Sequence, residues 1–106
     1  MVERTIDIDA VFYSLGDSTR RDILRRVAGA PQSIGVLAEA HPGLTFAAVA
    51  KHVGVLEEAK LVIKKREGKY QIISLNPRAL KAAEKVLESY QALWEKRFAQ
   101  LDELLK

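Results

Sequence analysis

Two helical segments on either side of a short break constrain the fold of this chain more than any other feature. Residues 33–40 and residues 44–59 both repeat apolar side chains at helical spacing, and His41-Pro42-Gly43 separates them. In the second segment the apolar stripe consists of Val49, Val53 and Leu56. The opposite face carries small or basic residues, namely Ala47, Ala50, Lys51 and Gly54. Two helices joined by a short turn that contains glycine, the second with such a face, are typical of a DNA-binding helix-turn-helix.

The N-terminal half of the second helix is the predicted base-reading surface, because that part of a recognition helix approaches the base edges. Thr45 is placed to cap the helix, and Lys51 points away from the apolar stripe, toward a phosphate or a guanine. His52 lies beside the stripe and is expected to pack or to bond the backbone. The residues predicted to line the DNA groove are Thr45, Phe46, Ala47, Ala50 and Lys51.

The net charge of +3 is concentrated in one part of the chain. Residues 44–70 hold 6 Lys/Arg against 3 Asp/Glu, whereas residues 1–43 hold 5 against 6 and residues 71–106 hold 6 against 5. A local basic surface favours binding to a polyanion, because neutralising phosphates releases counterions. A solvated charged face is the alternative interpretation of the same charges.

A basic β-hairpin is predicted directly after the second helix. Two runs rich in β-branched residues, 61–66 and 69–75, flank Glu67-Gly68, where the glycine can supply a positive φ. Four cations gather at its tip: Lys64, Lys65, Arg66 and Lys69. The hairpin is expected to lean on the helices through Val62, Ile63, Ile72 and Leu75. Such a hairpin is a wing, suited to phosphate or minor-groove contact, with a solvated hairpin tip as the alternative.

Two short helices are predicted before this unit, the first from about Asp9 and the second over residues 18–28, where Asp17 is the expected N-cap. The second helix carries four arginines toward its outer side: Arg20, Arg21, Arg25 and Arg26. Pairing with nearby acids is favoured for the last two. The first two are weaker candidates for phosphate contact.

A last helix is predicted from Pro77 to about Leu105, a length of roughly 40 Å. Large apolar residues recur along it at spacings of three and four, close to a heptad pattern. The rest of the chain is too small to cover this whole stripe, so a second copy is expected to pack its first and last helices against it. The predicted dimer residues are Phe12, Leu15, Leu87, Tyr90, Trp94, Phe98, Leu101 and Leu105. A pocket for an unknown small-molecule effector is the alternative use of the three aromatic residues on the last helix.

Length and composition fit this plan. We predict one domain over residues 1–106, with a DNA-binding core at 9–75 and a dimerisation helix at 77–105. The predicted fold is mainly α with a two-stranded β-wing: a winged helix-turn-helix with five helices, assembled as a homodimer through its first and last helices.

Several other classes of protein are disfavoured. The chain has no cysteine, which excludes a disulfide framework and a thiolate metal site. Apolar runs near 18 residues are absent, and acids stand where a signal peptide would be apolar, so neither a membrane span nor export is expected. We find no nucleophile–base pair, phosphate loop or metal triad in the sequence. The prediction is therefore a cytoplasmic protein that is not an enzyme and has neither a cofactor nor a metal site.

Four ordered segments resemble the ArsR-type winged-helix repressors of bacteria and archaea: LGDSTRRDIL (15–24), AAVAKHVGVLEEAKLV (47–62), KKREGK (64–69) and SLNPRAL (74–80). The tail at residues 88–105 resembles the subgroup with a Trp-Glu-x-Arg segment in a long final helix. The resemblance covers nearly the whole chain. It implies a homodimeric transcriptional regulator, usually a repressor of its own operon.

The chain departs from this family at its metal-ligand positions and along residues 46–54, where Gly54 also replaces a residue that is usually polar or basic. Metal-sensing members carry cysteines on the third helix or His, Asp and Glu ligands on the last one; here the third helix reads SIGVLAEA and the last has no histidine, which disfavours a soft-metal sensor. The family tends to have Gln-Pro-Ala-Val-Ser-Lys-His where residues 46–52 read Phe-Ala-Ala-Val-Ala-Lys-His. Direct hydrogen-bonded base readout is therefore expected to be thin. Phe46 and the alanines are suited to thymine methyl groups, and DNA shape is a further source of specificity.

Two functions remain in competition at this stage. The first is a dimeric DNA-binding transcriptional regulator, a repressor or autorepressor bound to double-stranded DNA at a palindromic operator. The second is a winged-helix protein-interaction module with only non-specific DNA affinity. The lack of polar side chains at positions 46 and 50, where the family usually has them, favours this second function.

Overall fold

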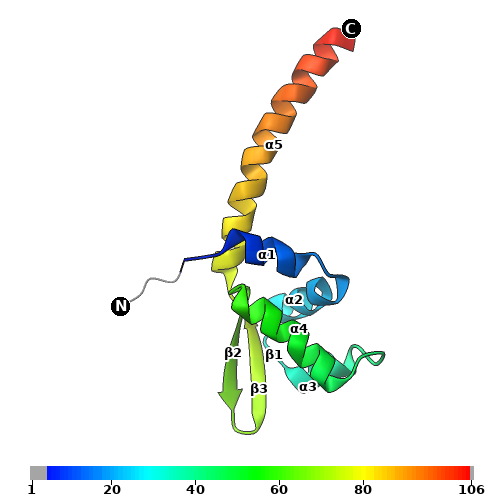
Figure 1. Ribbon diagram of the computed structural model, residues 1–106, viewed down its shortest axis with the longest axis vertical. Helices are drawn as coiled ribbons and strands as arrows, with labels where there is room; N and C mark the ends of the chain where they lie inside the picture. Colours follow the sequence, from blue (N-terminus) through cyan, green and yellow to red (C-terminus); the bar gives the residue numbers. More distant parts are fainter. Residues whose placement is uncertain (1–4, 106) are drawn as a thin grey trace.

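Five helices and three strands make up residues 5–105, the part of the chain that the computed structural model describes (Figure 1). In chain order they are α1 (Ile8–Leu15), α2 (Ser18–Gly29), β1 (Gln32–Ser33), α3 (Ile34–Glu39), α4 (Phe46–Glu58), β2 (Val62–Glu67), β3 (Tyr70–Leu75) and α5 (Pro77–Leu105). The predicted winged helix-turn-helix with five helices is confirmed. Residues 1–4 and 106 of the predicted domain lie outside the described residues.

Side-chain caps explain where the short helices begin. Asp7 accepts hydrogen bonds from the first turn of α1, and Asp17 accepts one of 3.0 Å from the backbone N–H of Arg20 in α2. Ser33 caps α3 in the same way, and the Thr45 hydroxyl oxygen accepts from the N–H of Ala48, 3.0 Å away, at the start of α4. Each cap satisfies a backbone donor that the helix itself leaves unpaired, which is worth about 1 kcal/mol.

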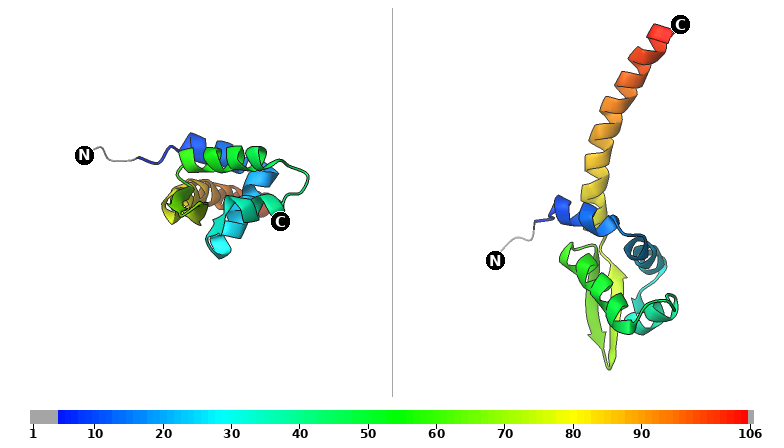
Figure 2. Two further views of the ribbon diagram at one scale, coloured as in Figure 1. Left: turned by 90° about the horizontal axis from the view of Figure 1, so that it is seen from below. Right: turned by 45° about the vertical axis from the view of Figure 1, so that its right-hand side comes forward.

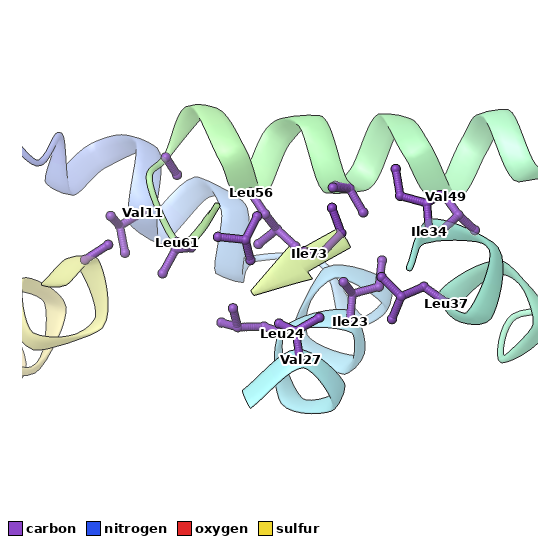
Figure 3. Packing of buried hydrophobic residues seen from close by; sticks show 14 of the residues in the cluster. Val11, Ile23, Leu24, Val27, Ile34, Leu37, Val49, Leu56, Leu61 and Ile73 are labelled. Atoms are coloured by element: carbon purple, nitrogen blue, oxygen red, sulfur yellow. The ribbon is translucent and has the colours of Figure 1, made fainter. Parts of the chain in front are cut away.

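The hydrophobic core lies between α4 and the helices α2 and α3, with the end of the sheet between them (Figure 3). The predicted stripe of α4 forms one wall, since Val49, Val53 and Leu56 are all fully buried. The opposite wall comes from α2 and α3, again as the helical spacing predicts: Ile23, Leu24, Val27, Ile34 and Leu37. This two-sided burial fixes the rotation of α4 about its axis, and therefore which of its residues face outward.

The wing belongs to a three-stranded antiparallel sheet with the order β1-β3-β2, so the structure adds one short strand to the two predicted. Gly68 takes a φ of 61° at the hairpin turn, the conformation that glycine adopts at little cost. The register pairs Lys64 with Ile73 and Lys65 with Ile72. Ile73 is the fully buried member of the last strand, while Ile63 is 51% exposed, so the prediction that Ile63 anchors the wing is wrong. Successive strand residues face opposite sides, and Val62 already takes the inward position.

The helix α5 packs against the body only at its start and then projects away from it (Figures 1 and 2). Ala79 and Ala83 are its buried residues, and it meets α1 there. Beyond Ala83, none of the described residues of this 29-residue helix is buried. The length of about 43 Å follows from the rise of 1.5 Å per residue.

Candidate DNA interface

The outward face of α4 is narrow, small and weakly polar. Opposite the buried stripe, Ala47, Lys51 and Glu58 are exposed and Gly54 is half-buried. Phe46, the first residue of the helix, is 58% exposed, although it is a large aromatic side chain. The structure thus brings together four of the residues predicted to line the groove: Phe46, Ala47, Ala50 and Lys51. Ala50 is half-buried at the edge of this face.

Thr45 stands just before these residues, but its hydroxyl oxygen is already used as the N-cap acceptor. His52 is half-buried, as expected from the sequence for a packed residue beside the stripe, and its ring bonds the Arg20 side chain and not the backbone. Lys51 therefore carries the one long polar side chain on the first half of the exposed face of α4. The face can make few hydrogen bonds to bases, and most of its surface is hydrocarbon.

Arg20 holds α2 against α1 and α4. Its guanidinium donates to the carbonyl oxygens of Ser14 and Tyr13 at 2.8 and 3.2 Å, and to Nδ1 of His52 at 3.3 Å. The same group lies 5.3 Å from the centre of the Tyr13 ring, in cation–π geometry. Arg20 thus has a structural role within the chain, and its predicted phosphate contact stays a prediction.

Arg21 has a smaller role of the same kind. It is exposed, and its guanidinium donates to the Leu15 carbonyl oxygen at 2.7 Å. That bond closes the turn between α1 and α2, and leaves other donors of the guanidinium for solvent or a phosphate.

A second cluster fixes the break in front of α4. His41 Nδ1 donates to the Leu37 carbonyl oxygen at 2.8 Å, and His41 Nε2 lies 2.8 Å from the Asp22 carboxylate. Arg26 donates to the same carboxylate at 2.8 Å, and Arg25 pairs with it as well, as the sequence predicted for these two arginines. The Arg26 hydrogen bond, with the neighbouring positive charges, holds the pKa of Asp22 below its ordinary value. The loop before α4 is therefore tied to α2.

The β2–β3 hairpin of the wing extends beyond the helices, with its turn at the far end (Figure 1). Lys64, Lys65, Arg66 and Lys69 are all exposed. Lys64 Nζ lies 3.4 Å from a Glu57 carboxylate oxygen, whereas Arg66 Nε donates to the Gly68 carbonyl oxygen at 3.0 Å. Lys69 lies 5.5 Å from the centre of the Tyr70 ring. Lys65 makes no ion pair to any described residue and is the cation of the wing with the most freedom.

Most of the large apolar residues that are exposed in the described part of the chain lie on the far half of α5, beyond Ala83. All six residues predicted for the dimer on this helix are between 48% and 78% exposed: Leu87, Tyr90, Trp94, Phe98, Leu101 and Leu105. Leu93 and Leu104, at 65% and 80%, widen the stripe beyond the predicted one. The Trp94 and Phe98 rings meet edge to face with centroids 4.7 Å apart. On a single chain these aromatic residues line only open depressions.

The two dimer residues predicted on α1 have a different environment. Phe12 and Leu15 are half-buried and pack against the core of their own chain. Tyr13, between them, is 70% exposed. The spacing of the apolar residues showed which side of α1 faces inward. It did not show whether Phe12 and Leu15 on that side pack in the core of their own chain or against a second copy.

Between residues 5 and 105, no three His, Asp or Glu side chains are grouped so that they could hold a metal ion. No described helix combines the length and the apolar character that crossing a membrane requires.

The comparisons with known proteins agree with this geometry. Residues 15–64 match a family described as a helix-turn-helix domain. The uncharacterized HTH-type transcriptional regulator YuzN of Bacillus subtilis is 40% identical over 79 residues, which cover 69% of this chain and 86% of YuzN. A solved ArsR-like transcriptional regulator from Rhodococcus sp. RHA1 is 30% identical, with a TM-score of 0.78 over 92% of this chain and 88% of that one. The chain belongs to the ArsR family of transcriptional regulators.

A second relative from Bacillus subtilis is described as a repressor. The transcriptional repressor SdpR of Bacillus subtilis is 31% identical over 70 residues, which cover 66% of this chain and 77% of SdpR. Family membership also confirms the prediction that the chain is a regulator and not an enzyme.

Proposed function

We propose that this ArsR-family regulator is a homodimer that binds a palindromic operator through α4 and the wing, and so represses transcription. The observation that carries the proposal is the separation of two exposed surfaces along the molecule. The basic wing lies at one end, and the apolar far half of α5 lies at the other (Figure 1). One end suits a polyanion and the other suits a second protein surface.

The DNA-binding part of the proposal rests on α4 and the wing together. Phe46, Ala47, Ala50 and Lys51 enter the major groove, with Thr45 at its edge. Lys65, Arg66, Lys69 and Lys64 neutralise phosphates beside the groove. Arg21 adds a phosphate contact from the start of α2, whereas Arg20 acts indirectly, by holding α4 in place through His52.

The homodimer part rests on the apolar face of α5. Aromatic and leucine side chains that are about half exposed or more, over several turns of a helix, are an unfavourable surface in water. A second copy of α5 covers this face by a two-fold contact, which is the commonest symmetry for such an interface. Phe12 and Leu15, half-buried in their own chain, offer their remaining surface to the partner. Two copies of α4 then lie roughly 34 Å apart, one turn of DNA, which calls for an operator with two-fold symmetry.

The relative SdpR supports repression as the direction of regulation, because it is described as a transcriptional repressor. A dimer bound at an operator within a promoter would repress by excluding the polymerase. Autorepression is the simplest form of that regulation, since it needs no effector. A small-molecule effector between α1 and the aromatic residues of α5 extends the same scheme. A regulator of this kind works at the chromosome, and we propose the cytoplasm as its location.

A protein-interaction module with only non-specific DNA affinity is the second candidate. The observation that favours it is the scarcity of free polar side chains on the first half of α4, where Lys51 is the one long example.

Selection of duplexes from a random pool by the full-length protein separates the two candidates. We expect an enriched motif with two-fold symmetry and half-site centres one DNA turn apart, bound at least about a thousandfold more tightly than unrelated duplex at physiological salt. A pool that remains random, with equal affinity for all duplexes, would contradict the operator proposal and support the interaction module.

A further inference from the structure

We propose that this protein reads thymine by its C5 methyl group, and that Phe46 is the residue that determines this specificity. The inference rests on the proposed function, because it concerns how the same surface of α4 distinguishes one base pair from another. It assigns to each operator half-site at least one thymine that contacts the Phe46 ring in the major groove.

The first step is the position of Phe46. It is the first residue of α4, directly after the Thr45 cap, and recognition helices enter the groove by this end. Its ring is 58% exposed, so the core of the chain does not account for it. An aromatic ring in this position gains stability when an apolar group of the duplex covers it.

The second step is the lack of competing polar readers. The Thr45 oxygen is occupied as a cap acceptor, and His52 Nδ1 accepts from Arg20. Ala47 and Ala50 contribute methyl groups only. Lys51 can donate a hydrogen bond to a guanine or to a phosphate, but its ammonium group does not recognise the methyl group that marks thymine.

The third step is the chemistry of the groove. Among the four base pairs, the thymine C5 methyl is the one apolar group exposed on the floor of the major groove. A surface made of an aromatic ring and two alanine methyls therefore has a single complementary feature to bind. Burying one methyl group against it contributes an affinity factor of about fourfold.

The test uses deoxyuridine, which pairs as thymine does but lacks the methyl group. Each thymine of the operator selected from the synthetic pool is replaced singly, and affinity is measured with the full-length protein by fluorescence anisotropy. We expect at least one position per half-site where the change weakens binding by about fourfold. In Phe46→Ala the same replacement should have no effect, because the ring that contacts the methyl is gone.

Two variants complete the design. Phe46→Leu keeps an apolar side chain and should retain part of the thymine preference. Val36→Ala removes a half-exposed aliphatic side chain from α3 instead, and should keep the full preference. Circular dichroism and thermal unfolding verify that Phe46→Ala, a change at an exposed site, leaves the fold intact.

The outcomes separate this inference from the proposed function. An enriched operator that tolerates uracil at every position overturns thymine reading alone, and so does a uracil effect that persists in Phe46→Ala. A pool without any enriched motif overturns both proposals together.

Discussion

Helix α4 and the far half of α5 both expose an apolar face, but the two faces differ in kind. The exposed side of α4 is small, with alanines and a glycine around Lys51 and one aromatic ring at its start. The exposed side of α5 is large, with Trp94, Phe98 and several leucines. A small face lets a rigid duplex approach closely, whereas a large face gains stability only when another protein surface removes it from water. Similar exposure therefore indicates two different partners.

The two helices also differ in how they are held. The stripe of α4 is fully buried, and its N-terminal loop is tied to α2 through His41 and Asp22. Helix α5 is held by the body only near Ala79 and Ala83. The orientation of α4 is therefore a property of one chain, while the position of the far half of α5 depends on the assembly.

The largest effect is expected from Trp94→Ala combined with Phe98→Ala. Each residue occurs twice in a two-fold interface, and truncating a central aromatic residue costs about 2–4 kcal/mol. The dimer dissociation constant should rise more than a thousandfold, as measured by sedimentation equilibrium. Operator affinity should fall to that of a single half-site. Lys96→Ala, at an exposed polar position of the same helix, is the control. A double variant that remains fully dimeric would show that another surface joins the copies.

A smaller effect is expected at the wing, from Lys64→Ala combined with Lys65→Ala. Each lost phosphate contact should lower affinity roughly tenfold near 0.1 M salt and reduce the salt slope of log K by about 0.9. The loss should be equal for operator and unrelated duplex, since phosphates carry no sequence information. Lys85→Ala on α5, measured by the same mobility-shift titration, controls for the change in net charge. Wild-type binding by the double variant would exclude the wing from the interface.

The dependence of the free energy of unfolding on pH in the acid range should come largely from Asp22. Its pKa is below the ordinary value of 3.8 in the folded chain, mainly because Arg26 donates to it. The stabilisation is therefore complete above about pH 4 and is lost as the pH falls below 3.8 toward the folded-state pKa. Asp22→Asn should lower the free energy of unfolding at pH 7 by about 1 kcal/mol and flatten its dependence on pH below 4.

Urea unfolding at several pH values measures this difference. Asp102→Asn, an exposed position on the far half of α5, should leave the pH dependence as in the wild type. An unchanged acid profile in Asp22→Asn would mean that the ties around His41 add nothing to stability.

Much of this architecture could be predicted from the sequence, because local rules determine it. The caps at Asp17, Ser33 and Thr45 and the buried stripe of α4 follow from residue type and helical spacing. The short strand β1 could not be predicted, since two residues carry no periodicity and pair with β3 only after the chain folds. Which residues of the wing face inward could not be predicted either. Ile73 is buried and Ile63 is exposed because of the strand register, and the sequence did not determine that register.

The site was harder to predict than the fold. Arg20 is a residue type that often contacts phosphate, but its bonds to Ser14 and Tyr13 of α1 and to His52 of α4 depend on two elements that only the fold brings to it. Leu93 and Leu104 were missed for another reason. A strict heptad stripe describes a narrow seam, whereas the exposed face of α5 is wider.

The smallest effect is expected at Gly54, in the middle of the outward face of α4. A Cβ built there meets nothing within 4 Å, so no contact inside the chain requires a glycine. Glycine in a helix interior costs roughly 0.5–1 kcal/mol relative to alanine, and Gly54→Ala should stabilise the fold by that amount in thermal unfolding. If the duplex approaches α4 as closely as its small face allows, the added methyl should weaken operator binding severalfold. Gly29→Ala at the end of α2, where a Cβ also has open space, should leave binding unchanged. A more stable Gly54→Ala that binds as tightly as the wild type would confine DNA contact to the first turns of α4, where Phe46 and Lys51 lie.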